Sequence, residues 1–174
     1  MKNLYIIIFV ISILVLHCAT GNKVKHKHLW RFDDPYINQT IMNAWENIQK
    51  KRFEWAALDF TRLIQKGYID YDILFGAGLS FLFMNNDNKA LDYFTQAIEH
   101  NPFHFEAYYF RAKIYIKNGS KEKAKKDLTA IINMEYYEPI ICGYYFNDND
   151  IADNNALNAK KKEAQQLLLA IAHD

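Results

Sequence analysis

The strongest constraint on the fold is a set of side chains that recurs every 34 residues in the middle of the chain. Two of the recurring positions are small in every copy, and two more are apolar. The small ones are Ala44, Gly78 and Ala112, and Ala56, Ala90 and Ala124; the apolar ones are Phe60, Phe94 and Leu128, and Leu63, Ala97 and Ile131. A period of this length is typical of solenoids that stack one helical hairpin on the next.

The small residues have a physical meaning. Two antiparallel helices cross closely only where each carries a small side chain, because a larger one would force the axes apart. The chain also holds only 6 Gly and 3 Pro, too few turn-formers for a sandwich or barrel with a turn every ~8–12 residues. We therefore expect an all-α protein made of about three helix pairs.

These residues resemble the tetratricopeptide repeat, whose unit reads W-x2-L-G-x2-Y, then A-x3-F, then P. The second copy matches at Leu74, Ala77, Gly78, Phe81, Ala90, Phe94 and Pro102. The third reads Tyr108, Arg111, Ala112 and Tyr115, then Ala124 and Leu128, with Tyr136 where Pro is usual. The first is degenerate at Thr40, Asn43, Ala44 and Asn47, and fits at Ala56 and Phe60. The resemblance implies a solenoid with repeats at 37–70, 71–104 and 105–138.

The first residues read as an export signal. Lys2 is followed by a run over residues 4–16 that is apolar except for one Ser. As a helix this run would span about 20 Å, short of a ~30 Å hydrocarbon core, so we expect a signal peptide over residues 1–17 and a tether over 18–36. A retained membrane anchor is the alternative. Cleavage would precede Cys18, because Val15-Leu16-His17-Cys18 resembles a bacterial lipobox with Cys18 as the lipidated residue, or it would follow Gly21 in an ordinary export signal.

The chain after the repeats divides into two parts. Pro139 ends the repeat pattern, and residues 139–155 form a connecting segment that is apolar over 140–146 and polar beyond. A final helix is expected over 156–172, with an apolar face at Leu157, Ala164, Leu168 and Ile171. Because a solenoid exposes an apolar face at its end, we expect this helix to cap the third repeat.

The resemblance also implies where a partner would bind, since the first helix of each pair lines a concave groove in this family. The register places ten residues there: Ile41, Trp45, Ile48, Phe75, Leu79, Leu82, Phe83, Tyr109, Lys113 and Ile116. One subset of the family holds C-terminal carboxylates with Lys, Arg and Asn at such positions. That clamp is not expected here, because Ile41, Trp45, Phe75, Leu79 and Tyr109 occupy the corresponding places.

Two interpretations of this apolar groove stay open. It could receive a helix or extended segment of a partner protein, with the aromatic side chains as anchors. Alternatively it could be filled from within the chain, by residues 140–146 or by the stretch containing Leu29, Trp30 and Phe32.

Composition and motifs narrow the functional class. Lys and Arg number 21 against 20 Asp and Glu, a net charge of +1, so no long-range field would attract nucleic acid, and apolar contact is expected to supply affinity. No catalytic constellation, cofactor motif or metal site can be assembled, and Cys142 among apolar neighbours is expected to be a buried thiol. We expect a non-enzymatic protein-binding module of the cell envelope, anchored to a membrane by lipid at Cys18, with no nucleic-acid partner, small-molecule substrate or cofactor. A self-associating structural protein is the alternative.

Overall fold

The protein is described by a computed structural model over residues 32–135 and 155–173. Within those residues the elements are helices: α2 (Pro35–Gln49), α3 (Phe53–Gln65), α4 (Tyr71–Phe83), α5 (Asp87–His100), α6 (Phe105–Lys117), α7 (Lys121–Asn133) and α8 (Asn155–His173). The expected all-α class is confirmed. The signal peptide, Cys18, most of the tether and nearly all of the connecting segment lie outside the described residues.

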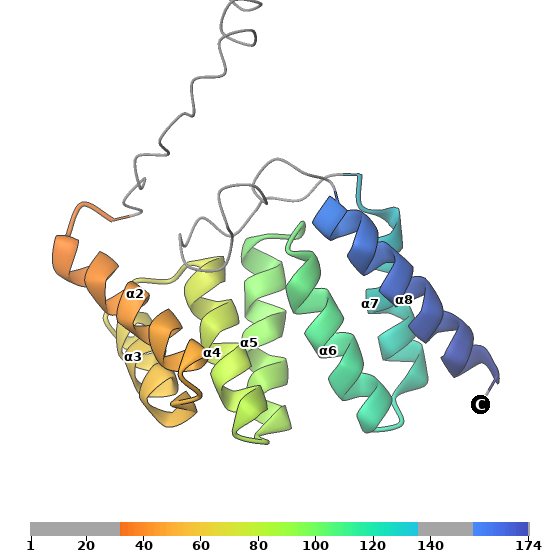
Figure 1. The fold of residues 1–174 in the computed structure, drawn as a ribbon, viewed down its shortest axis with the longest axis horizontal. Helices are drawn as coiled ribbons and strands as arrows, with labels where there is room; N and C mark the ends of the chain where they lie inside the picture. Colours follow the sequence, from red (N-terminus) through yellow and green to blue (C-terminus); the bar gives the residue numbers. More distant parts are fainter. Residues whose placement is uncertain (1–31, 136–154, 174) are drawn as a thin grey trace, which may run out of the picture.

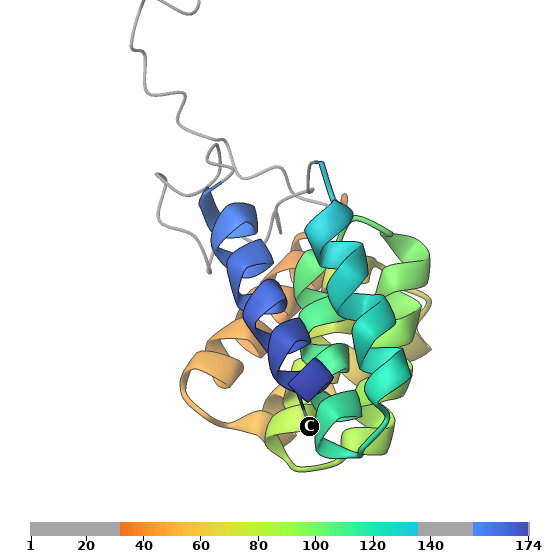
Figure 2. The ribbon, with the colours of Figure 1, turned by 90° about the vertical axis from the view of Figure 1, so that its right-hand side faces the viewer.

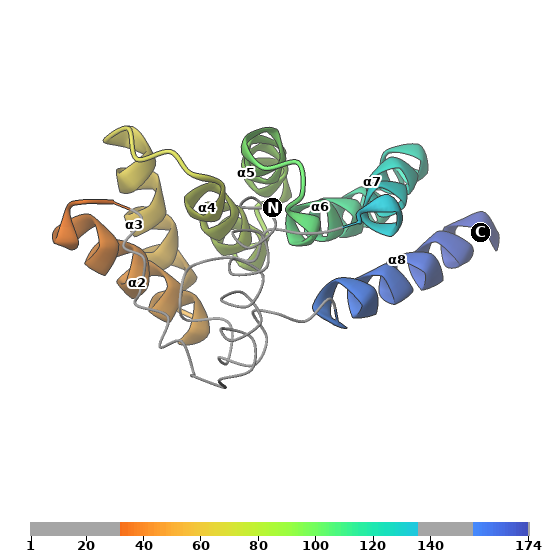
Figure 3. The ribbon, with the colours of Figure 1, turned by 90° about the horizontal axis from the view of Figure 1, so that it is seen from above.

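The helices form three antiparallel pairs, α2/α3, α4/α5 and α6/α7, stacked side by side (Figure 1). Seen from above, the stack is an arc, with α2, α4 and α6 on its inner side and α3, α5 and α7 on its outer side (Figure 3). The last helix, α8, runs alongside α7 and also contacts α6 (Figure 2). The expected solenoid of three helix pairs with a C-terminal capping helix is therefore the observed architecture.

The recurring small residues lie at the helix crossings. Ala44, Ala56, Ala90, Ala112 and Ala124 have no exposed surface. A Cβ atom at Gly78 would lie 2.6 Å from the ring of Phe94, which shows how closely α4 and α5 approach. The physical interpretation of the 34-residue spacing is correct.

Aromatic rings join neighbouring pairs. Trp45 packs edge-to-face on Phe60, with ring centroids 5.3 Å apart, and lies 6.3 Å from Phe75. Phe75 in turn lies 5.7 Å from Phe94 and 6.0 Å from Phe110. This chain of rings runs through the first core cluster, from the first repeat to the third. A second cluster, built on α6, α7 and α8, includes Leu128, Ile131 and Leu157.

The three turns within the pairs have one conformation. Lys51, Asn85 and Gly119 are spaced 34 residues apart and have φ of 58°, 58° and 70°. In each turn the next residue donates its N–H to a carbonyl five residues earlier, at 2.8 Å for Arg52 to Asn47. This left-handed ending is typical of helix C-termini and favours Gly, yet only the third turn has one.

Candidate partner-binding face

The inner side of the arc contains both buried and accessible residues among the ten predicted for the groove. Five of them are at most 5% exposed: Ile41, Trp45, Ile48, Phe75 and Leu79. Leu82, Tyr109 and Ile116 are half-buried, and Phe83 and Lys113 are exposed. The positions therefore fall into a buried group in the first two repeats and an accessible group, which lies at the end of α4 and along α6 from Tyr109 to Ile116.

Ring packing accounts for much of the buried group. Trp45 contacts Phe60 of its own pair and Phe75 of the next, while Phe75 also lies 4.4 Å from the His104 ring. Both side chains belong to the core. Truncating either would leave a cavity and lower the stability by roughly 3–5 kcal/mol, so neither is a suitable probe of partner binding.

The central helix α4 is enclosed. Every residue over 71–81 is buried, including Asp72 and Ser80. Ser80 satisfies its hydroxyl by donating to the Gly76 carbonyl at 2.8 Å. A helix that is apolar around its whole circumference is expected in a protein interior. Only the C-terminal end of α4, at Leu82 and Phe83, reaches the surface.

The structure describes only a part of the two chain segments that we considered as occupants of the groove. Residues 140–146, Leu29 and Trp30 lie outside the described residues. Phe32 packs edge-to-face on Tyr68, in the connection between α3 and α4, at 5.3 Å. The Asn38 side chain fixes its backbone, accepting from Phe32 N at 3.3 Å and donating to Phe32 O at 2.6 Å.

Tyr109 ties the capping helix to the inner face. Two ammonium groups lie over its ring, Lys160 Nζ of α8 at 4.1 Å and Lys113 Nζ of α6 at 5.5 Å from the centroid. Its hydroxyl donates to the Glu163 carboxylate, which also binds Lys160 at 2.9 Å. Burial, followed by the bond to Glu163 and its charge, raises the pKa of Tyr109 to about 12. Tyr109 therefore stabilises the position of α8 as well as lining the inner face.

Two comparisons identify the repeat. A family model described as tetratricopeptide repeat matches residues 105–136. A curated relative, the tetratricopeptide repeat and J domain-containing co-chaperone DNJ1 of Cryptococcus neoformans var. grubii, is 28% identical over 134 residues. The chain is a tetratricopeptide-repeat protein. That alignment covers 76% of the chain but 26% of the co-chaperone, so the chain spans about a quarter of that relative's length.

Solved structures share the repeat fold. The Yersinia enterocolitica type III secretion translocator chaperone SycD has a TM-score of 0.64 at 15% identity, over 78% of this chain and 83% of that one. SycD in complex with a peptide of the translocator YopD has a TM-score of 0.63 at 15% identity, over 80% and 94%. PcrH in complex with the chaperone binding region of PopD has a TM-score of 0.65 at 13% identity, over 83% and 97%. At these identities the likeness concerns the fold.

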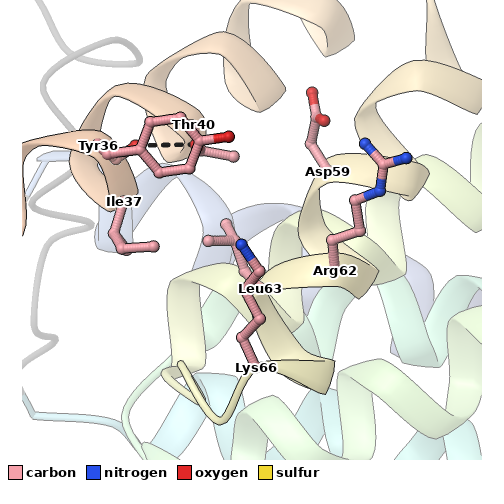
Figure 4. Close-up of a pocket in the computed structure, with 7 residues that line it drawn as sticks. All are labelled: Tyr36, Ile37, Thr40, Asp59, Arg62, Leu63 and Lys66. Atoms are coloured by element: carbon pink, nitrogen blue, oxygen red, sulfur yellow. Dashed lines mark hydrogen bonds between the residues drawn. The ribbon is translucent and has the colours of Figure 1, made fainter.

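Two surface hollows lie on the part of this repeat protein between residues 32 and 135. One of about 50 Å³ lies between α2 and α3 (Figure 4), lined by Tyr36, Ile37, Thr40, Asp59, Arg62, Leu63 and Lys66. Burial, partly offset by the Arg62 charge and a bond from Asn47, raises the pKa of the Asp59 carboxyl. A hollow of this volume accommodates water and is far below the 300–1,000 Å³ of a typical small-molecule site.

A second hollow of about 300 Å³ opens beside the ends of α5 and α7, lined by Pro102, Phe103, Tyr108, Ala130, Asn133, Met134 and Glu135. Over residues 32–135 and 155–173, no three His, Cys, Asp or Glu side chains converge as a metal site requires. None of the helices described is both long and apolar enough to cross a bilayer.

Three features of the tetratricopeptide-repeat scaffold were not predicted. Gly76 lies against the Phe60 ring, His104 caps α6 by accepting from Ala107 N at 3.3 Å, and Arg111 binds Asp127. A sequence signal exists for the last of these. Arg111 stands at a position where the repeat pattern has an apolar residue, and a buried cation there needs a carboxylate on a facing helix.

Proposed function

We propose that this protein is a non-enzymatic interaction module that binds a segment of another protein along the accessible part of its inner face. That face consists of Leu82 and Phe83 at the end of α4, and Tyr109, Lys113 and Ile116 on α6. The fold supports this proposal, because tetratricopeptide solenoids present a continuous inner surface. Two structural neighbours support it as well, since SycD forms a complex with a translocator peptide and PcrH with the chaperone binding region of PopD.

One observation carries the choice of site. Lys113 is exposed on the inner side of α6 and, within the described part of the chain, has no carboxylate within 4.0 Å. The Lys113 ammonium lies 5.5 Å from the centroid of the Tyr109 ring. Ile116 follows Lys113 by about one helical turn. An aromatic ring, an aliphatic side chain and an exposed cation on adjacent turns can recognise an apolar segment that carries a carboxylate.

The alternative is a self-filled groove in a self-associating protein. The burial of Ile41, Trp45, Ile48, Phe75 and Leu79 favours it, because these positions have no surface left for a second protein to contact. Residues 140–146 are the apolar segment that the sequence offers as an occupant. In this alternative, replacing residues 140–146 by Gly and Ser in the full chain would change the oligomeric mass or expose Trp45 fluorescence to quenching by acrylamide.

The cellular setting belongs to the same proposal. Residues 1–17 are proposed as an export signal and Cys18 as the lipid attachment site, which would hold the repeats at a membrane of the cell envelope. Labelling cells with an alkyne fatty acid tests this, with Cys18→Ser as the control. An unlabelled mature wild-type chain would contradict the lipid anchor.

The binding proposal is tested by selecting a phage-displayed peptide library on the full mature chain and measuring affinities of the enriched peptides by calorimetry. We expect Lys113→Glu and Ile116→Ser each to weaken binding about tenfold or more, because both change the centre of the accessible face. Trp55→Ser is the matched control, since Trp55 is 62% exposed on the outer helix α3 and its loss should leave affinity unchanged. Enriched peptides that bind the Lys113 and Ile116 variants as well as the wild type would overturn the proposed site.

A further inference from the structure

The two edges of the arc carry opposite charge. We define the turn edge as the three turns within helix pairs, residues 49–54, 83–89 and 117–123, which lie together along the lower side of Figure 1. It holds seven Lys and Arg against three Asp and Glu. The opposite edge, residues 32–35, 66–72, 100–106 and 134–135, holds six Asp and Glu against one Lys. The net charge of +1 therefore conceals a strong separation of charge along the helix axes.

The three turns form one continuous surface. Phe53, which begins α3, lies 4.8 Å from Phe83, which ends α4, so the first turn contacts the second. Lys117, which ends α6, binds Asp87 at the start of α5 at 2.6 Å, so the second turn contacts the third. A ligand can therefore reach basic groups of all three repeats at once.

Several of these cations form no ion pair within the part of the chain that the structure describes. Over the described residues, Lys51, Arg52 and Lys121 have no carboxylate within 4.0 Å. Arg52 occupies the N-cap position of α3 without forming a side-chain cap bond, and Lys121 begins α7, where the helix dipole disfavours a positive charge.

The backbone conformation at Lys51 supports the same conclusion. Its φ of 58° lies in the left-handed region, which costs a residue with a Cβ roughly 1–2 kcal/mol. The equivalent position in the third turn is Gly119. A strained, unpaired cation where glycine would fit better indicates that the side chain has a role outside the fold.

Apolar surface lies among these charges. Phe83 is 45% exposed and Met84 is 36% exposed, beside the half-buried Phe53. These side chains are more than half covered, so they form a flush patch that can receive an apolar side chain. A bilayer, in contrast, is entered by side chains that protrude.

We infer that the turn edge is a second docking surface, for an acidic segment of a protein partner that carries one or two apolar side chains. Its carboxylates pair with Lys51, Arg52 and Lys121, and its apolar side chain packs on Phe83 and Met84. Charge complementarity identifies the occupant, since an acidic segment relieves unpaired cations that the fold leaves to solvent. The turn edge shares Phe83 with the inner face, but Lys113 and Ile116 take no part in it, so variants of these two residues test the two proposals separately.

The test uses the full mature chain and a fluorescein-labelled peptide of Asp and Glu around a central Phe-Leu pair, followed by fluorescence anisotropy. We expect saturable binding that weakens as salt is raised. Lys51→Glu/Arg52→Glu should weaken it about tenfold, and replacing Phe-Leu by Ser-Ser in the peptide should weaken it several-fold. Changing the peptide tests the apolar contact without disturbing the protein.

The matched control is Lys161→Glu/Lys162→Glu on α8, which makes the same change in net charge away from the turn edge and should leave the affinity as in the wild type. Circular dichroism confirms that both variants are folded. Equal binding by the turn-edge variant and the wild type would overturn the inference. So would binding to phosphatidylserine vesicles without binding to the peptide, which would assign the edge to a membrane surface. Variants Lys113→Glu and Ile116→Ser should bind this peptide normally, so failure of the inner-face proposal would be seen separately.

Discussion

Arg111 on α6 donates two hydrogen bonds to the Asp127 carboxylate on α7, from Nε to Oδ2 at 2.8 Å and from Nη2 to Oδ1 at 2.7 Å. A third bond, from Nη1 to the Thr95 hydroxyl of α5 at 3.0 Å, brings in the preceding pair. The rings of Tyr108 and Tyr115 lie 5.6 Å and 6.0 Å from the guanidinium. One side chain thus connects the second and third repeats through polar contacts inside an apolar stack.

Removing this guanidinium should destabilise the protein strongly. The Asp127 side chain is 3% exposed, so Arg111→Ala leaves a buried carboxylate without its partner and should lower the free energy of unfolding by about 3 kcal/mol. Arg111→Met/Asp127→Leu should recover most of this loss, because it removes both charges. Urea denaturation measures each value. The control Lys125→Ala breaks an exposed ion pair with Glu122 and should change stability by less than ~0.5 kcal/mol; a similar effect from Arg111→Ala would contradict the assignment.

Gly76 should not tolerate a methyl group. A Cβ atom there would lie 2.3 Å from Cζ of Phe60, which is fully buried. Alanine favours a helix by ~1 kcal/mol over glycine, but the overlap should outweigh this and lower stability by about 2 kcal/mol net. The matched measurement is a thermal melt of Gly76→Ala, Phe60→Leu and the double variant. The double variant should be more stable than the summed single effects, and strict additivity would contradict the contact.

Stability at high pH should depend on Tyr109. Its pKa is raised from 10.0 to about 12 in the folded protein, mainly by burial and then by Glu163. The stabilising contribution is therefore fully present below pH 10 and is lost as the pH rises through about 12, because the unfolded chain ionises first. In Tyr109→Phe the decline in unfolding free energy between those pH values should be shallower than in the wild type. Parallel curves for the two proteins would count against a raised pKa.

Lys51→Gly should separate stability from binding. Glycine has no Cβ to clash at a φ of 58°, although it loses more chain entropy on folding, so the net gain should be about 0.5–1 kcal/mol. The same change removes one cation from the turn edge and should weaken the binding of the acidic peptide. Chemical denaturation and anisotropy on one preparation give both values.

Gly119→Ala, where the methyl meets no atom within 4 Å but φ is 70°, should lower stability by about 1 kcal/mol.

The fold could be predicted from the sequence because its determinants are local and repeated. The positions of Ala44, Gly78 and Ala112 reflect a contact that every pair makes in the same way. The 34-residue spacing therefore indicated the helix pairs and their crossings, and the apolar face over residues 156–172 indicated the capping helix. Gly76 could not be recognised by this route, because the equivalent position in the third repeat is Phe110, whose ring stacks on Phe94 at 6.0 Å, so the register shows no recurring small residue there.

The accessibility of the inner face could not be predicted in the same way. The register places both Trp45 and Phe83 on the expected inner face, yet one is core and the other is exposed. Exposure depends on all the elements that surround a side chain, and Trp45 meets the rings of Phe60 and Phe75. Phe83 lies at a helix end, where its ring packs on that of Phe53 and stays 45% exposed.

The sequence by itself determined the class of fold, the register of its repeats and the absence of a large net charge. Only the tertiary structure decided which apolar residues remain accessible and how the charges are distributed. Lys51 and Lys121 are 70 residues apart, and they come to the same edge because stacked hairpins place equivalent turns side by side. In the composition, positive and negative charges nearly cancel. In the folded stack, they lie at opposite ends of the helices.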